Sequence, residues 1–418
     1  MVWSALSLDT WLSRQQATLT DVSDAVQAII DEVATGGDTA LYDLCERFDK
    51  VRPDNLRISD DDIDTAYDTA DPEIVEALTE AHARISMFHE QQRQQDLWLT
   101  ESEPGITLGV KTTPLQRIGM YVPGGRAAYP STVLMCAVPA QVAGVKEIIC
   151  CTPPPANPLT LIAADIAGVT EIYTVGGAQA IAAMALGTPS IKRVQKIVGP
   201  GNAYVTAAKM ALRGRVETDF PAGPSEIAII ADHTARPDFI AADILAQSEH
   251  DPQAASVLIT TDSKLPQNVE TWIERMMADA PRKEIIRAAL NQSGYLVVPS
   301  LQDAVEASDK IAPEHLSIQV QDALPVLNSI KNAGSIFVGP YAPVACGDYA
   351  SGTNHVLPTA GNARLYSGLN VAHFTKTATL QIVSRTGIEN IGDIVETIAT
   401  AEGLPAHARS VRIRREDI

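Results

Sequence analysis

The chain has 418 residues, of which 45% are hydrophobic and 20% are charged, as is usual for a globular α/β protein. This length predicts two or three domains rather than one core. The net charge of −19, without any cluster of Lys and Arg, argues against nucleic acid as a partner. No apolar run reaches the roughly 20 residues that would span a bilayer, so no membrane association is expected.

The cysteines indicate a reducing compartment. Their number is odd and their spacing shows no repeat, which argues against a disulfide framework. The N-terminal stretch MVWSALSLDTWLSRQQ lacks the basic and apolar regions of a secretory signal. We therefore expect a cytoplasmic protein. The five cysteines are Cys45, Cys136, Cys150, Cys151 and Cys346.

The first hundred residues have helical periodicity, with a break at Gly36-Gly37 and a second long helix after Asp71-Pro72. From about residue 108 short β-branched runs alternate with helical ones, first up to about residue 209 and then again from EIAIIAD at 226. Alternation of this kind predicts βαβ units and parallel sheets. After about residue 370 the pattern becomes mixed.

These patterns predict an α/β fold with two Rossmann-like parallel-sheet domains, a helical N-terminal region and a small C-terminal segment. We expect the following organisation: an N-terminal arm over residues 1–20, a first α/β domain over 21–120 plus 226–370, an inserted Rossmann-like domain over 121–225, and a C-terminal segment over 371–418.

Three glycine-rich passages follow predicted strands, at 121–131, 174–181 and 197–209. Free backbone N–H groups at strand ends and helix N-termini suit phosphate or dinucleotide binding. The third passage comes closest to the dinucleotide fingerprint, but Tyr204 stands where the third glycine should be. For any one passage, a simple tight turn is an equally good interpretation.

The predicted helix PDFIAADILAQSEH contains a possible metal site. Its apolar positions Ile240 and Ile244 continue to Gln247 and His250, which puts two metal-capable groups at the end of a core-facing stripe. A histidine that merely caps the helix is the competing interpretation. A mixed nitrogen and oxygen ligand set would suit zinc or manganese, and further candidates for it are Asp348, His355, Glu402 and His407.

Other histidines divide into surface and catalytic candidates. His82 and His89 lie on charged helices and are expected to face solvent, and His233 is expected in a loop. Glu314 and His315 stand side by side after a proline, where a carboxylate and an imidazole could share base duties at neutral pH. The alternative is an exposed polar helix start.

Taken together, the segments YVPGG, VGGAQAI, GPGNAYV, AGPSE, AQSEHD, PEHL, GDYASGTNHVLPT and AEGLPAH resemble the histidinol dehydrogenase family, in the family's order and from about residue 20 onward. The resemblance implies oxidation of L-histidinol to L-histidine through the aldehyde, the final steps of histidine biosynthesis, with two NAD per product and one Zn²⁺ per subunit. It implies that Glu314 activates water and that His315 acts as the base. The metal ligands it implies are Gln247, His250, Asp348 and His407.

The same resemblance implies substrate and cofactor contacts and an assembly. The implied NAD-binding residues are Tyr121, Gln179 and Asn202, within the domain over 121–225. The family is a homodimer with shared active sites, in which the segment over 371–418 crosses to the partner subunit. The implied substrate contacts are Ser225, Gln247, His250, His315, Asp348, His355, Glu402 and His407.

Several alternatives remain open at the level of sequence. A paralogous zinc- and NAD-dependent dehydrogenase could oxidise another amino or sulfonated alcohol. An aldehyde dehydrogenase of the thiohemiacetal type would need an exposed cysteine, whereas Cys136, Cys150 and Cys151 fall in apolar segments. A metal-dependent hydrolase or a binding module would leave the glycine turns unexplained. A regulatory protein that has lost catalysis would be expected to lack Glu314 or His315, and this chain has both.

Overall fold

The computed structural model describes residues 3–16, 22–124, 128–221 and 223–416. The chain divides into two compact units, each made of discontinuous segments: unit 1 comprises residues 1–92 and 116–373, and unit 2 comprises residues 93–115 and 374–418. None of the helices within the described residues is long and apolar enough to cross a membrane. The predicted grouping of residues 21–120 with 226–370 stays a prediction.

Three helices form the first long stretch of unit 1. The first bends at Gly37, whose φ of +53° and ψ of −132° are not helical, so the predicted break at Gly36-Gly37 is confirmed. The next begins with a capping box between Ser59 and Asp62, and the third has Pro72 in its first turn. The three helices are α2 (Ser23–Asp49), α3 (Asp60–Thr69) and α4 (Pro72–Glu90).

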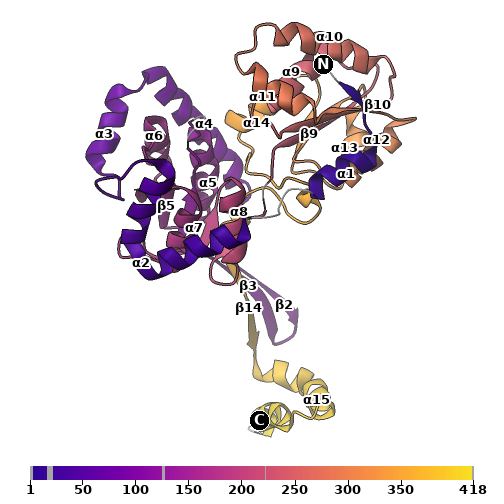
Figure 1. Ribbon diagram of the computed structural model, residues 1–418. Helices are drawn as coiled ribbons and strands as arrows, with labels where there is room; N and C mark the ends of the chain where they lie inside the picture. The colour runs from indigo at the N-terminus through magenta and orange to yellow at the C-terminus, as the bar shows by residue number, and fades with distance from the viewer. Residues whose placement is uncertain (1–2, 17–21, 125–127, 222, 417–418) are drawn as a thin grey trace. The chain divides into compact units, whose positions relative to one another are not determined.

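These helices pack around a parallel sheet of five strands in the order β6-β5-β4-β7-β8. Helix α2 packs on α7 and α8, whereas α4 packs on α5. Figure 1 shows them gathered around this sheet. The strands are β4 (Arg117–Tyr121), β5 (Glu147–Thr152), β6 (Glu171–Thr174), β7 (Lys196–Val198) and β8 (Glu217–Thr218), and the helices between them are α5 (Pro130–Ala143), α6 (Pro158–Ile166), α7 (Gly177–Leu186) and α8 (Ala203–Ala211).

A second parallel sheet has six strands in the order β1-β11-β10-β9-β12-β13. Its central strand is buried along its whole length, which matches an apolar run covered on both faces. Two parallel sheets with helices between their strands confirm the predicted fold class. The strands are β1 (Ser4–Ala5), β9 (Glu226–Ala231), β10 (Ala255–Thr260), β11 (Gly294–Val297), β12 (His315–Gln319) and β13 (Ser335–Val338).

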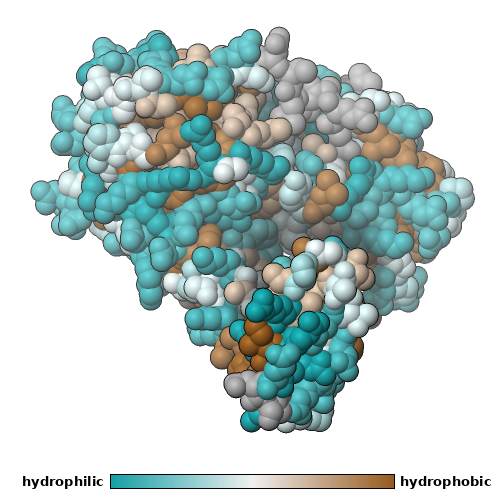
Figure 2. All heavy atoms as spheres, turned by 90° about the horizontal axis from the view of Figure 1, so that it is seen from below, coloured by the Kyte–Doolittle hydropathy of each residue, from teal (hydrophilic) through white to brown (hydrophobic). Residues whose placement is uncertain are grey.

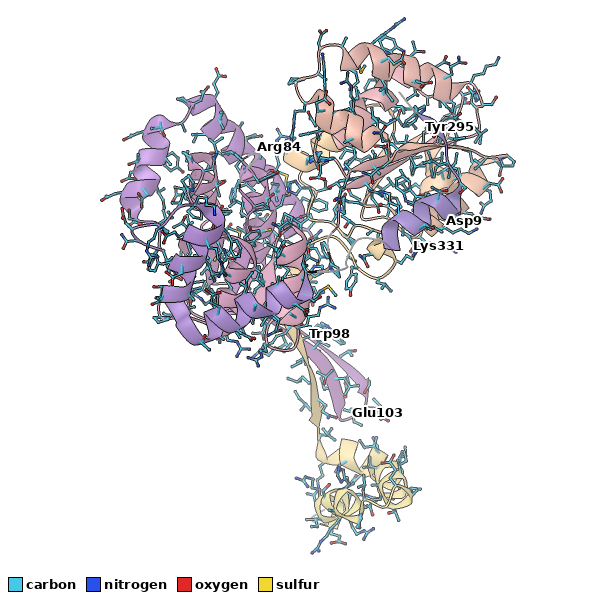
Figure 3. The ribbon with its side chains drawn as sticks, viewed as in Figure 1. Asp9, Arg84, Trp98, Glu103, Tyr295 and Lys331 are labelled. Carbon is cyan, nitrogen blue, oxygen red and sulfur yellow. The ribbon has the colours of Figure 1, made fainter. Side chains whose placement is uncertain are left out.

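The helices of this sheet include one from the N-terminus of the chain. Helix α1 contacts α12, so the indigo start of the chain lies beside orange segments in Figure 1. Figure 3 labels Asp9 on α1 and Tyr295 on β11, whose ring stacks at a tilt on Trp3. The helices are α1 (Leu8–Gln16), α9 (Pro237–Ser248), α10 (Leu265–Met277), α11 (Lys283–Leu290), α12 (Leu301–Ile311), α13 (Ala323–Ser329) and α14 (Val344–Tyr349). A loop with two 3-10 turns, at Asn362–Arg364 and Val371–Phe374, follows α14.

Unit 2 joins two distant parts of the sequence in one antiparallel sheet, a feature that the periodicity did not predict. Strand β3 (Ile106–Pro114) pairs with β2 (Leu97–Glu103) on one side and with β14 (Thr375–Val383) on the other. Helices α15 (Arg385–Ala401) and α16 (Pro405–Glu416) follow. Figure 3 labels Trp98 and Glu103 on β2, and in Figure 2 the C-terminal helices present a hydrophilic surface with apolar side chains between.

Candidate active site

The sequence-predicted catalytic residues gather at the amino edge of the six-stranded sheet. Ser225 directly precedes β9, and His315 is the first residue of the neighbouring strand β12. Helix α9 follows β9 and leads back to the start of β10, so its C-terminal residue pair, Gln247 and Ser248, returns to the same edge. The βαβ connection is therefore what brings these separate sequence segments together.

Glu314 is a buried carboxylate fixed by its neighbours. It is only 5% exposed, and its Oε2 accepts a hydrogen bond from the backbone N–H of Glu226 at 2.9 Å. The Ser225 side chain donates to it as well. Burial, with the nearby carboxylates of Glu226 and Asp348, nevertheless raises the pKa of Glu314 well above its ordinary value. A carboxylate of high pKa is a stronger base, which suits proton abstraction from water.

Neither ring nitrogen of His315 has a side-chain hydrogen-bond partner among the described residues, although the ring interacts with the backbone of Glu226. Its Nδ1 lies 3.7 Å from Glu314 Oε2, and its Nε2 lies 4.0 Å from Asp348 Oδ1. Burial, followed by the charge of His250, lowers the pKa of His315 to about 3, so the imidazole is neutral. A buried neutral imidazole has one unprotonated nitrogen, which can accept a proton from a bound substrate.

Asp348, on helix α14, and His355, in the loop that follows it, belong to the same cluster as Glu314 and His315. His355 Nδ1 donates to the backbone carbonyl of Asp348 at 2.8 Å, which leaves Nε2 as the acceptor atom. Burial lowers the pKa of His355 to about 4 and raises the pKa of the Asp348 carboxyl to about 7. His250 interacts electrostatically with both His315 and His355. The structure thus assembles His250, Glu314, His315, Asp348 and His355.

The prediction that a core-facing stripe ends in Gln247 and His250 is confirmed for Gln247 and wrong for His250. Gln247 is buried, and its Nε2 has no partner among the described residues. The helix ends at Ser248, however, so His250 lies beyond it and is exposed rather than core-facing. A backbone that has left the helix no longer follows the 3.6-residue period, which is why the extrapolation failed.

The donor set fits a divalent cation in part. Gln247 offers an unpartnered amide, His250 an imidazole, and Asp348 a carboxylate whose pKa is raised by its burial. Nitrogen and oxygen donors of this kind suit zinc or manganese. Within the described residues, no three His, Cys, Asp or Glu side chains already form a metal-binding group.

The two remaining sequence-predicted site residues belong to unit 2. Glu402 is the C-cap of α15, and His407 lies in the first turn of α16; both are exposed. The roles of Glu402 and His407 in the site stay predictions.

His89, which we expected to face solvent, is fully buried, and the prediction was wrong. Its Nδ1 donates to Gln92 Oε1 at 2.8 Å, and its Nε2 accepts from Asn354 Nδ2 at 3.3 Å. Asn354 also donates to the carbonyl of Met135 at 2.7 Å. Asn354 directly precedes His355, so this network anchors the loop that carries a predicted substrate contact. His82, on the same helix, is half-buried rather than solvated.

Replacing His89 with leucine is expected to lower the free energy of unfolding by about 2 to 4 kcal/mol, because the side chains of Gln92 and Asn354 would lose a buried hydrogen bond each. Urea denaturation followed by circular dichroism measures this. The matched control is His82→Leu on the same helix, whose Nε2 has no partner among the described residues and which should cost less than about 1 kcal/mol. Equal losses for both variants would contradict a role for the network.

The predicted NAD-binding residues occupy the carboxyl edge of the five-stranded sheet. Tyr121 ends β4, and its hydroxyl accepts a hydrogen bond from the Gly177 N–H at 3.1 Å. Gln179 is buried in the first turn of α7. Asn202 caps α8, with its Oδ1 accepting from the N–H groups of Tyr204 and Val205. The structure thus places all three at the edge where parallel sheets bind nucleotides.

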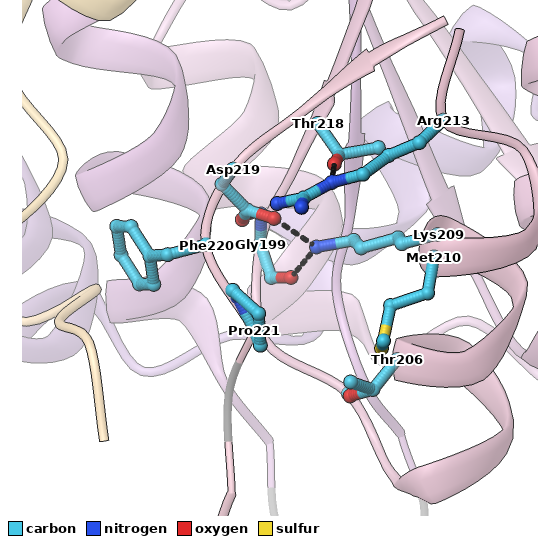
Figure 4. Close-up of a pocket in the computed structure, with 10 residues that line it drawn as sticks. Gly199, Thr206, Lys209, Met210, Arg213, Thr218, Asp219, Phe220 and Pro221 are labelled. Carbon is cyan, nitrogen blue, oxygen red and sulfur yellow. Dashed lines mark hydrogen bonds and ion pairs between the residues drawn. The ribbon is translucent and has the colours of Figure 1, made fainter. Parts of the chain in front are cut away.

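The turn that carries Asn202 is held by two residues that the sequence analysis did not identify, Lys209 and Asp219. Lys209 and Asp219 form a buried ion pair beneath it, at 2.7 Å between Nζ and Oδ1 (Figure 4). The GPGN sequence indicated a glycine turn, but no local pattern linked Lys209 in a helix to Asp219 after the next strand. Glu226, whose N–H fixes Glu314, was missed as well, although it directly follows the predicted contact Ser225.

The cysteines give no support to thiohemiacetal chemistry at the predicted positions. Cys136, Cys150 and Cys151 are completely buried, and burial raises the pKa of each thiol. A nucleophilic cysteine needs an accessible thiolate. The structure thus confirms that these three cysteines lie in buried, apolar segments.

Comparison with known proteins finds one family over nearly the whole chain. A family model described as histidinol dehydrogenase matches residues 12–415. Histidinol dehydrogenase of Methanosarcina mazei is 49% identical, over 95% of this chain and 92% of the relative. That of Aliivibrio fischeri is 44% identical, over 100% and 97% respectively. The crystal structure of histidinol dehydrogenase from Elizabethkingia anophelis superposes with a TM-score of 0.95 at 39% identity, covering 99% of this chain and 97% of that one.

Proposed function

This chain belongs to the histidinol dehydrogenase family, and from that membership we propose that it oxidises L-histidinol to L-histidine through L-histidinal. It is an NAD-dependent oxidoreductase of histidine biosynthesis. Conversion of an alcohol to an acid removes two hydrides, and NAD accepts each of them. The observation that carries the proposal is the buried Glu314–His315 pair, held beside Asp348 and His355.

His315 would take the hydroxyl proton of the alcohol as the hydride leaves. Its neutral ring supports this role, because one nitrogen of a neutral imidazole is unprotonated and can accept the proton. In the second half of the reaction Glu314 would take a proton from water as the water adds to the aldehyde. The protonated His315 would give its proton to the aldehyde oxygen as the water adds, and, neutral again, would take the hydroxyl proton of the hydrate during the second oxidation. Burial of both groups would exclude bulk water and retain the aldehyde.

Binding and orientation would fall to the remaining residues. His355 presents an acceptor nitrogen, since its Nδ1 is held by the Asp348 carbonyl. Gln247, His250 and Asp348, with His407, would hold Zn²⁺, which when bound would orient the substrate by its imidazole and amino nitrogens. Glu402 would pair with the substrate ammonium. The unpartnered amide of Gln247 and the raised pKa of Asp348 support a cation at this place.

A direct assay tests the function. Purified protein is given NAD and L-histidinol, NADH is followed by absorbance, and the histidine formed is quantified. We expect about two NADH per histidine. A metal-loaded sample that reduces NAD with another amino alcohol but not with histidinol would overturn the proposal and point to a paralogous dehydrogenase.

We further propose a homodimer in which Glu402 and His407 complete the site of the partner subunit. Unit 2 exposes many large apolar side chains, which often marks an interface between subunits. The exposed residues of this kind on β2 and α15 are Leu97, Trp98, Leu99, Ile394 and Ile398.

Co-expression of two inactive variants tests the shared site. A heterodimer of His315→Asn and His407→Asn chains would contain one site with both native residues, so it should regain activity that neither homodimer has. Sedimentation of the mixture confirms that it is dimeric. A dimer without regained activity would show that each chain completes its own site.

A further inference from the structure

The turn between β7 and α8 lies so close to its neighbours that only glycine fits. Gly199 has a φ of +107°, and a Cβ on it would overlap the carbonyl oxygen of Tyr121. A Cβ on Gly201 would overlap the side chain of Val205. The next residue, Asn202, caps α8 with its side-chain oxygen. The position of this turn therefore determines where Asn202 and the start of α8 stand relative to Tyr121.

Both polar backbone groups of Gly199 are bound by one buried ion pair. Lys209 Nζ donates to the Gly199 carbonyl and, at 2.7 Å, to Asp219 Oδ1. Asp219 Oδ2 in turn accepts from the Gly199 N–H at 2.8 Å. The side chains of Lys209 and Asp219 are 9% and 2% exposed. Figure 4 shows Lys209 reaching from α8 to Asp219 and to the Gly199 carbonyl.

Stability alone does not account for such a pair. The loss of hydration of two buried charges roughly cancels their attraction, and a well-packed apolar pair is often as stable. A charged pair does, however, require particular partners: the ammonium needs acceptors and the carboxylate needs donors. Here Gly199 supplies one of each, so the pair fixes the orientation of the peptide groups on both sides of Gly199.

We propose that Lys209 and Asp219 are positioning residues for NAD, which hold the Gly199 turn in the conformation that presents Asn202 and the N-terminus of α8 to the dinucleotide. Neither side chain needs to touch NAD. Preorganising a binding loop strengthens affinity because the ordering cost is met before the ligand arrives. The inference deepens the proposed function and rests on NAD binding at this edge.

The same sheet offers a matched control at its opposite edge. Arg117 is a similarly buried cation, with a side chain 9% exposed, and it pairs with Glu147 and Glu171. These three are the first residues of β4, β5 and β6, whereas the Gly199 turn lies beyond the carboxyl end of β7. Loss of this pair should affect the fold of the sheet without reaching the NAD turn.

The test compares Lys209→Met/Asp219→Leu with Arg117→Met/Glu171→Leu in the full-length, metal-loaded protein. Isothermal titration with NAD alone, without histidinol, measures affinity apart from turnover. We expect the dissociation constant for NAD to rise at least about tenfold in the first variant and to stay within about twofold in the second. The KM for histidinol and the metal content should stay within about twofold in both, because the residues proposed to bind them lie outside the five-stranded sheet.

The outcomes distinguish failure of the positioning role from failure of the proposed function. If the Lys209/Asp219 variant binds NAD as tightly as the unaltered protein, or if both variants lose affinity equally, the positioning role is overturned while the proposed function stands. If the unaltered protein binds no NAD, the proposed function and this inference both fail. Should the apolar pair prevent folding, Lys209→Met/Asp219→Asn removes both charges at nearly constant side-chain size and carries the same expectation.

Discussion

Asparagine in place of His315 is expected to reduce kcat for histidinol oxidation by about 10² to 10⁴-fold, the usual contribution of a general base. The expectation follows from the ring's position, because it is buried and neutral and lies beside Glu314 and Asp348. Both oxidations require loss of a hydroxyl proton, so both half-reactions should slow. Stopped-flow assays that start from histidinol and from histidinal measure them separately.

The variant Glu314→Gln tests the other residue of the Glu314–His315 pair, and its two half-reactions are expected to differ. If Glu314 acts on water alone, this variant should lose most of its rate from histidinal but little from histidinol. His233→Asn, a change at an exposed histidine, should leave both rates unaltered. Equal loss of both half-reactions in Glu314→Gln would contradict the division of roles, and full activity of His315→Asn would remove His315 from the chemistry.

Asparagine in place of Asp348 is expected to abolish metal binding and to reduce turnover by at least about 10²-fold, since a neutral amide is a poorer ligand for a hard divalent cation than a carboxylate. Elemental analysis after dialysis measures the metal. Chelation of the unaltered protein should give the same loss of activity, reversed by added Zn²⁺. It should also lower Tm, because a ligand that binds only the folded state stabilises it.

Asp243→Asn is a closely matched control for this variant. Asp243 is buried and lies on α9 one turn before Gln247. Loss of hydration raises its pKa to about 7, as it does for Asp348. Its carboxylate accepts from Gln319 Nε2 at 3.2 Å and is not among the predicted ligands. It should keep its metal. A metal content that falls equally in both variants would indicate loss of structure rather than loss of a ligand.

Local patterns were sufficient to predict the parallel sheets. Runs such as EIAIIA are apolar on both faces, and a parallel strand covered by helices on both sides has that composition. The candidate site is a different case: the adjacent Glu314 and His315 come from a segment separate from that of Asp348, and only the family resemblance related the two segments before the structure did. Composition and spacing alone left a histidine that caps a helix and an exposed polar helix start as alternatives.

What could not be predicted depends on partners that are distant in sequence. His89 continues the buried face of α4 at helical steps from Ala81 and Ile85, a signal that was available but was outweighed by the charged residues around it. Its partner Asn354, by contrast, is 265 residues away. The Lys209–Asp219 ion pair could not be predicted for the same reason, because a helical pattern does not indicate which carboxylate a lysine side chain will contact.

The pairing of β3 with β14 in unit 2 has a consequence for how the chain acquires its structure during synthesis. Pro114 pairs with Thr375, and Ile106 with Val383, so residues 115–374 lie between the two strands. A ribosome releases β2 and β3 early, as a two-stranded hairpin with an open edge, and such a hairpin alone is marginally stable in water. The sheet is closed only when almost all the rest of the protein has been translated. Nascent chains that stall before residue 383 would expose this unpaired edge and be prone to aggregate.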